Sequence, residues 1–175
     1  MLLGQSAQHH MLDGFIVTEG GRYVGIGATQ VLMRMITDMQ ITAARYANPL
    51  TQLPGNVPIS EHIDRLLQSD AEFVACYCDL DHFKPYNDHY GYRHGDQLIQ
   101  ALGSLLEQSG DARLDFVGHI GGDDFILLMQ SADWQEKLDT TLQLFAEAIA
   151  AMCDKQHRLH GGHWGEDRRG NAIFH

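Results

Sequence analysis

The chain has 175 residues, of which 44% are hydrophobic and 20% are charged, and its formal net charge at pH 7 is -11. This acidic balance argues against non-specific nucleic-acid binding, which requires a basic surface. No apolar run is long enough to span a bilayer and no basic leader precedes one, so we expect a cytoplasmic protein without a membrane segment. Cysteine is odd in number, and Cys76 and Cys78 lie on one apolar run, which predicts buried reduced thiols rather than a metal or disulfide framework.

Residues 1–30 contain two short apolar runs, Phe15–Thr18 and Tyr23–Ile26, on either side of Glu19-Gly20-Gly21. This pattern predicts two strands around a glycine turn, and two strands cannot bury a core alone. The stretch resembles the closing hairpin of a CBS-type sensory module. We therefore interpret residues 1–30 as the remnant of an upstream module.

The next segment, residues 31–47, has apolar residues at alternating steps of four and three, which predicts an amphipathic helix. The apolar positions are Leu32, Ile36, Met39, Ala43 and Tyr46. At about 1.5 Å per residue the helix is roughly 24 Å long, which suits a connection between a sensory and an output domain. A helix that lies on its own domain explains the pattern equally well, since two heptads do not establish a coiled coil.

Residues 48–175 read as an output domain. The pattern predicts a strand at 73–78 that is apolar on both faces, as a central strand is. It then predicts a helix at 95–108, a hairpin at 116–129 and a long helix at 138–152. A loop at 48–56 and a helix from Ile59 to Leu67 precede them. This order predicts an α+β fold, with a ferredoxin-like or palm-like antiparallel sheet flanked by helices. Such a sheet calls for one more strand, so we expect the domain to be truncated at its C-terminus.

Short polar motifs recur at the ends of the predicted strands and helices: Asp79–Lys84, Asn87-Asp88, Gly95-Asp96 and Gly121–Phe125. Adjacent strands would bring Asp79, Asp123 and Asp124 to one end of the sheet. Three carboxylates at one edge repel one another unless a cation holds them, and Mg²⁺ is the hard cation that prefers oxygen ligands and triphosphates. The sequence therefore predicts a magnesium site at this end of the sheet.

The order and spacing of these motifs resemble the GGDEF family of diguanylate cyclases over about residues 48–130. Asn48–Asn56 is similar to the signature that opens these domains. The resemblance implies that Mg²⁺ or Mn²⁺ is bound by Asp79, the Leu80 carbonyl, Asp123 and Asp124, with Asp124 as the catalytic acid that activates the ribose hydroxyl. It also implies residues that bind GTP: His82, Phe83 and Lys84 at the phosphates, Asn87 and Asp96 at the guanine, and Gly121 and Gly122 at the turn.

The family's activity is the condensation of two GTP molecules into cyclic di-GMP by a homodimer, under the control of an upstream sensory domain. This is our first hypothesis. The second is a catalytically degenerate GGDEF module that binds GTP and regulates an attached partner, such as an EAL-type phosphodiesterase domain. A third is a palm-like cyclase or polymerase relative acting on another nucleotide, although Asn87 and Asp96 favour guanine.

The departures from the family pattern favour the degenerate module. Asp124 replaces the usual Glu, which shortens the side chain by one methylene, and Asn48, Gln52 and Tyr92 differ from the usual residues. The family's last strand and helix motifs are not found after Cys153, where the sequence instead predicts a solvated, His-rich tail. Asp115 matches the acid of the family's inhibitory site, but Ala112 stands at its Arg position, so we do not expect product inhibition.

Overall fold

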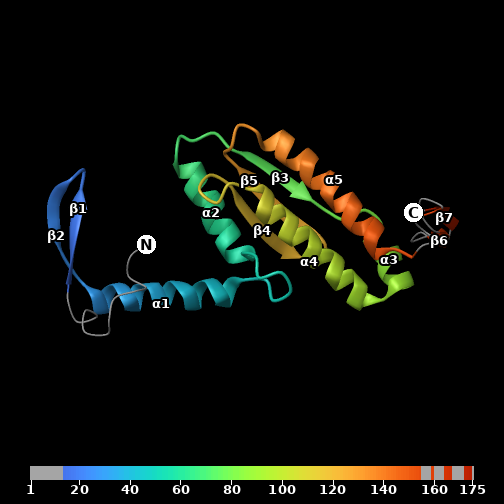
Figure 1. The fold of residues 1–175 in the computed structure, drawn as a ribbon, viewed down its shortest axis with the longest axis horizontal. Helices are drawn as coiled ribbons and strands as arrows, with labels where there is room; N and C mark the ends of the chain where they lie inside the picture. Colours follow the sequence, from blue (N-terminus) through green and yellow to red (C-terminus); the bar gives the residue numbers. More distant parts are fainter. Residues whose placement is uncertain (1–13, 155–158, 160–163, 167–171, 175) are drawn as a thin grey trace. The chain divides into compact units, whose positions relative to one another are not determined.

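The computed structural model describes residues 14–154, 159, 164–166 and 172–174 (Figure 1). After Arg45 the chain divides into two compact units, and each has its own architecture. In the described part of the chain, no helix is long and apolar enough to cross a membrane.

The first unit contains a hairpin and nearly all of one helix. Strand β1 (Gly14–Glu19) pairs antiparallel with β2 (Arg22–Ala28), and Gly20 and Gly21 between them have φ values of 56° and 78°. Glycine adopts such values readily, so the predicted glycine turn is confirmed. Helix α1 (Thr29–Tyr46) follows, and none of its side chains is buried. A hairpin of this kind does not identify a CBS-type module, which stays a prediction.

The second unit is an α+β domain built on a three-stranded antiparallel sheet. Its strands are β3 (Val74–Cys78), β4 (Phe116–Gly121) and β5 (Asp124–Met129), in the order β3-β5-β4. The expectation of a central strand at 73–78 is wrong for the described residues, because β5 lies in the middle and β3 lies at the edge. The run looked apolar on both faces, but Tyr77 is 62% exposed, and Ala75 on the same face is also exposed.

In the described part of this unit the sheet is accompanied by the helices α2 (Asn56–Gln68), α3 (Phe83–Tyr90), α4 (Tyr92–Ser109) and α5 (Trp134–Met152) (Figure 1). Helices α4 and α5 cover one face, and the core between them and the sheet contains Leu98, Leu102, Leu106, Phe125, Leu127 and Phe145. The helices predicted from periodicity at 59–67, 95–108 and 138–152 are thereby confirmed.

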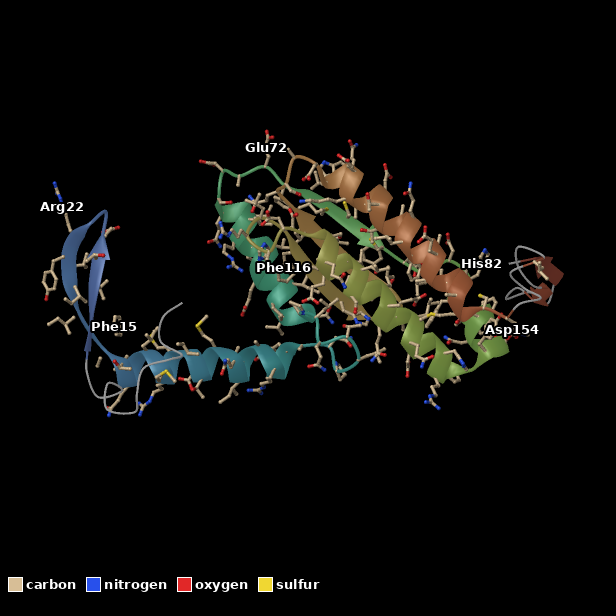
Figure 2. The ribbon with its side chains drawn as sticks, in the orientation of Figure 1. Phe15, Arg22, Glu72, His82, Phe116 and Asp154 are labelled. Carbon is tan, nitrogen blue, oxygen red and sulfur yellow. The ribbon has the colours of Figure 1, made fainter. Side chains whose placement is uncertain are left out.

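Helix α2 covers the opposite face of the sheet. Side chains alternate along a strand, so Gly118 and its ladder partner Ile126 face away from Phe125 and Leu127. Ile59 of α2 lies against Gly118, where a side chain would overlap it. His62 of α2 stacks on Phe116 with ring centroids 4.3 Å apart (Figure 2).

The last part of the chain forms two short strands that the sequence did not predict. Strand β6 (Trp164–Glu166) pairs antiparallel with β7 (Ala172–Phe174), separately from the three-stranded sheet. The histidines expected in a solvated tail, His157, His160, His163 and His175, lie outside the described residues.

The cysteines are free, as predicted, but they are only partly buried. Cys76, Cys78 and Cys153 are free thiols that pack against the core. Burial raises the pKa of the Cys76 and Cys78 thiols, so both stay protonated at neutral pH.

Candidate functional site

The end of β3 and the turn between β4 and β5 bring acidic side chains together. Cys78 and Phe125 form the last pair between β3 and β5. The next residues, Asp79 after β3 and Asp124 before Phe125, therefore lie at the same end of the sheet, beside Asp123. Burial raises the pKa of Asp123, and a hydrogen bond and charge repulsion from Asp79 raise it further, as does the charge of Asp124. The effect of Asp79 on this pKa indicates that the two carboxyl groups lie near one another. The structure therefore places Asp79 and Asp123 together.

The turn that carries Asp123 depends on glycine for its backbone conformation. Gly121 pairs with Asp124, so Gly122 and Asp123 form a two-residue loop. Gly121 has φ 150° and Gly122 has φ 61°, values that glycine adopts more readily than other residues. A Cβ at either glycine would meet no described atom within 4 Å. The glycines are thus required by φ and not by crowding, and the turn leaves open space beside Asp123.

Tyr77 belongs to this site, although the sequence analysis did not single it out. It lies two residues before Asp79 on β3, so both side chains point to the same face of the sheet. A hydrogen bond from its hydroxyl to the Asp124 carboxylate raises the pKa of Tyr77, with smaller effects from burial and from Asp79 and Asp123. The spacing of two along a strand was the signal that could have identified it.

The residues expected at the phosphates lie where β3 leads into α3. His82 precedes the helix with φ 59°, a left-handed conformation in which His is enriched, and the Phe83 amide donates to the Leu80 carbonyl at 3.3 Å. Lys84 Nζ lies 3.3 Å from Asp88 Oδ2, and the two side chains are 74% and 59% exposed. Such exposed pairs contribute little, so Lys84 can exchange Asp88 for another anion at small cost.

The two residues expected at the guanine lie close together on successive helices. Asn87 is on α3, Asp96 is on α4, and the intervening Gly91 has φ 83°. The Asn87 amide lies against Gly95, where a Cβ would overlap its Oδ1. Asn87 Oδ1 is buried and accepts no hydrogen bond from any described residue. An unsatisfied buried acceptor is costly, so this oxygen is suited to a donor on a ligand.

The oxygen atoms of this site are of the kind that bind a hard cation. Among the described residues, no three His, Cys, Asp or Glu side chains are arranged to enclose a metal ion. The site instead offers the Asp79 and Asp123 carboxylates and the nearby Leu80 carbonyl. Mg²⁺ is typically bound by one or two carboxylates together with waters and substrate phosphates, so an incomplete protein shell is what its chemistry requires.

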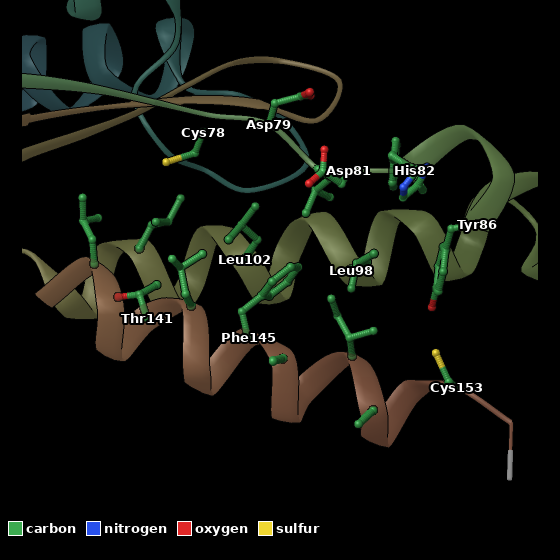
Figure 3. Close-up of a pocket in the computed structure, with 18 of the residues that line it drawn as sticks. Cys78, Asp79, Asp81, His82, Tyr86, Leu98, Leu102, Thr141, Phe145 and Cys153 are labelled. Carbon is green, nitrogen blue, oxygen red and sulfur yellow. The ribbon is translucent and has the colours of Figure 1, made fainter. Parts of the chain in front are cut away.

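A cavity of about 830 Å³ lies between the open edge of β3 and helices α4 and α5 (Figure 3). Cys78 points toward it, whereas Asp79 points away from α4 and α5. Its walls are mostly apolar side chains, with Phe145 contributed by α5 and Cys153 by the residue that follows α5. The cavity is therefore mostly apolar, and Tyr77 and Asp79 of the acidic site also line it.

Asp115 does not lie free on the surface as a ligand-binding acid would. Its side chain is 1% exposed, and it accepts hydrogen bonds from the amides of Asp111, Gln130 and Ser131, from the Ser131 hydroxyl and from Lys137 Nζ, at 2.8–3.3 Å. Burial acts to raise its pKa, but these hydrogen bonds outweigh burial and lower it. Asp115 therefore joins the start of β4 to the end of β5 and the start of α5.

Fold and site together define an α+β domain with a pair of carboxyl groups and a diglycine hairpin at one end of its sheet. The family model described as "Diguanylate cyclase, GGDEF domain" matches residues 46–163. The chain belongs to the GGDEF domain family.

Two curated relatives come from Pseudomonas aeruginosa. Diguanylate cyclase DgcP is 28% identical over 143 residues, which cover 72% of this chain and 20% of DgcP. The bifunctional diguanylate cyclase/cyclic di-GMP phosphodiesterase MucR is 31% identical over 88 residues, which cover 48% of this chain and 13% of MucR. The chain thus spans only a small part of the length of these relatives.

Solved structures agree with the assignment of the fold. Diguanylate cyclase SiaD from Pseudomonas aeruginosa, in complex with its activator SiaC, has a TM-score of 0.57 and 27% identity, covering 64% of this chain and 45% of that one. The coiled coil and GGDEF domain of DgcB from Caulobacter crescentus, in complex with c-di-GMP, has a TM-score of 0.55 and covers 82% of this chain and 71% of that one. At 21% identity, DgcB supports the fold alone.

Proposed function

We propose that this domain condenses two GTP molecules into cyclic di-GMP in a reaction that depends on Mg²⁺ or Mn²⁺. The observation that carries the proposal is the convergence of Asp79, Asp123 and Asp124 at one end of the sheet, where burial and the charges of Asp79 and Asp124 raise the pKa of Asp123. Their mutual repulsion favours a divalent cation, and membership of the GGDEF family supplies the substrate class. A bound Mg²⁺ would neutralise charge on the phosphates.

Each remaining part of the site has a role in holding GTP. The buried Asn87 amide oxygen and the exposed Asp96 carboxylate would accept hydrogen bonds from the guanine, whose ring N–H and amino group are donors that adenine does not present in that pattern. Lys84 would turn from Asp88 to the phosphates. Asp124, oriented by the Tyr77 hydroxyl, would accept the proton of the attacking ribose hydroxyl.

Cyclic di-GMP contains two equivalent nucleotides, so each of two copies of the domain would contribute one GTP. Helix α1 supports a dimer because its apolar side chains are exposed: Ile36 is 37% exposed and Met39 is 69% exposed. Pairing of α1 between two copies would bury these apolar side chains and bring two domains together. On this proposal, a sensory module that precedes α1 would control the encounter of the two sites.

We propose that the sheet is completed by a strand of the same polypeptide that follows α5. The edge of β3 that faces away from β5 has no partner strand among the described residues. The apolar cavity is lined by Tyr77 and Cys78 at the end of β3 and by Cys153, which follows α5. An extended segment placed there would form hydrogen bonds with the unpaired backbone groups of β3 and bury the apolar walls of the cavity.

A degenerate module that binds GTP without turnover is the second candidate. The observation that favours it is Asp124, whose carboxylate is one methylene shorter than the usual Glu and is held by Tyr77 on the face of β3. A displacement of about 1 Å at a reacting centre can lower a rate roughly 100-fold. GTP binding would then serve to regulate an attached domain, for example an EAL-type phosphodiesterase.

The two candidates are separated by incubating the protein with GTP and Mg²⁺ and quantifying cyclic di-GMP by mass spectrometry. A cyclase forms the product, and Asp123→Asn abolishes it, whereas Asp139→Asn, an exposed acid on α5, does not. A degenerate module binds GTP without forming product, and Asp124→Glu restores turnover. A protein that binds no GTP would contradict both candidates.

A further inference from the structure

His119 links the loop before α2 to the turn that carries Asp123. The imidazole is 1% exposed and stacks on Phe125, with ring centroids 4.3 Å apart and ring planes inclined by 15°. Its Nδ1 lies 2.8 Å from Thr51 Oγ1, and its Nε2 lies 3.0 Å from the Gly122 carbonyl oxygen. Both ring nitrogens of this buried side chain are therefore engaged.

The partners define the tautomer of the ring. A carbonyl oxygen can only accept, so Nε2 must carry the proton that is donated to Gly122. In the neutral ring Nδ1 is then an acceptor, and the Thr51 hydroxyl donates to it. Thr51 thus fixes both the tautomer and the orientation of the imidazole.

The backbone around His119 strengthens the same connection. The His119 amide donates to the Pro54 carbonyl at 2.8 Å, and Asn56 Nδ2 donates to the Ile120 carbonyl at 3.3 Å. Pro54 of the loop and Asn56 at the start of α2 therefore each bond to the backbone of this end of β4, and Thr51 of the loop bonds to the His119 side chain. The imidazole extends that support across the strand end into the turn.

The Gly122 carbonyl is a sensitive point in the turn. It belongs to the peptide between Gly122 and Asp123. The direction of this carbonyl therefore determines the orientation of the Asp123 backbone, and with it the position of the carboxyl group that lies near Asp79. The ladder is irregular between His119 and Gly121, and two successive glycines leave the backbone free to adopt other conformations. A hydrogen bond from a buried, stacked ring removes that freedom.

We propose that His119 is a positioning residue: oriented by Thr51, it holds the Gly122 carbonyl and thereby sets the Asp123 carboxyl group against Asp79. Its effect on nucleotide binding rests on the proposed function, but its effect on the turn does not. A change at Thr51, far from the acids along the chain, alters the turn through the imidazole.

The first test concerns the turn alone. In the wild-type protein, the ¹⁵N shifts of His119 should show the Nε2–H tautomer at neutral pH. Thr51→Val and His119→Phe should each speed hydrogen exchange of the Asp123 and Asp124 amides about tenfold, the effect of losing one hydrogen bond. Thr51→Ser keeps the hydroxyl and should restore the wild-type rate. The matched control is Thr140→Val, which removes an exposed hydroxyl bonded within α5.

The second test links the turn to the ligand. Thr51→Val should weaken Mg²⁺-dependent GTP binding about tenfold, whereas Thr140→Val should leave it unchanged. The opposite tautomer, or unchanged exchange and affinity in Thr51→Val, would overturn the proposal. If the wild-type protein binds no GTP, the proposed function fails, and the tautomer and exchange rates still decide the role of His119.

Discussion

The amide oxygen of Asn87 occupies the space that a side chain at position 95 would need, so Gly95 is required by its neighbour and not by its own backbone. Gly95 is buried within α4, where glycine usually weakens a helix. The loss of helix stability caused by Gly95 is explained if the Asn87 amide must occupy this position in order to contact a base.

Gly95→Ala should therefore weaken GTP binding without unfolding the domain. The added methyl meets the end of a mobile side chain, so the Asn87 amide can swing away, and the gain in helix propensity of about 1 kcal/mol offsets the crowding. We expect the Kd for GTP, measured by calorimetry, to rise about tenfold. Gly25→Ala, where a Cβ meets open space, is the control. An unchanged Kd in Gly95→Ala would contradict a role for Asn87 in guanine recognition.

Because Asp79 lies near Asp123, we expect charge repulsion between them to lower the stability of the metal-free protein at neutral pH. The folded-state pKa of Asp123 is raised above its unfolded value, so its ionised form costs stability above the folded pKa, and the cost disappears as pH falls through that value. Asp123→Asn should thus raise the melting temperature at pH 7 in EDTA, and the gain should shrink toward pH 4. A melting temperature below wild type at pH 7, with Asp139→Asn unchanged, would argue against this account.

Asp115 should contribute to stability with the opposite dependence on pH. Its folded-state pKa is lowered, so its stabilisation is present above the ordinary Asp value of about 3.9 and is lost as pH falls through the folded pKa. We expect Asp115→Asn to lower the free energy of unfolding in urea by about 2 kcal/mol at pH 7, because several charge-assisted hydrogen bonds are weakened. Equal stability of Asp115→Asn and Asp139→Asn would refute this role.

Tyr77 and Asp124 should act together on the reaction. Removing the hydroxyl in Tyr77→Phe leaves the Asp124 carboxylate free to rotate, so we expect kcat for cyclic di-GMP formation to fall roughly tenfold with little change in KM. In Asp124→Glu the carboxylate moves one methylene beyond the hydroxyl, and adding Tyr77→Phe should then cost much less. Additive effects in this double-mutant cycle would show that the two side chains act independently.

The regular elements of the domain followed from hydrophobic periodicity, because α2, α4 and α5 each bury one face and leave the other in water. The glycine hairpin and the position of Asp79, Asp123 and Asp124 at one end of the sheet could also be predicted, since strand ends and a tight turn restrict where these acids can lie. The position of β3 in the sheet could not be predicted from the sequence, because an alternation of Cys, Tyr and Ala does not distinguish an edge strand from a central one.

The supporting residues of the site were beyond sequence reasoning for a different reason. Thr51 and His119 are 68 residues apart, and nothing in the sequence places the Asn87 amide against Gly95. Tyr77 has a local signal in its spacing from Asp79, but nothing in the sequence marks its hydroxyl as a partner of Asp124. Such contacts depend on how separate elements pack and not on the pattern within any one of them.

The most direct test of the account is a titration of GTP into the wild-type protein and Asp123→Asn, each with Mg²⁺ and with EDTA. If Asp79 and Asp123 jointly hold a cation that binds the phosphates, the wild-type protein will bind GTP only with Mg²⁺, and Asp123→Asn will lose that dependence together with most of its affinity. Equal GTP affinity with and without Mg²⁺ in the wild-type protein, or unchanged metal-dependent binding in Asp123→Asn, would contradict it.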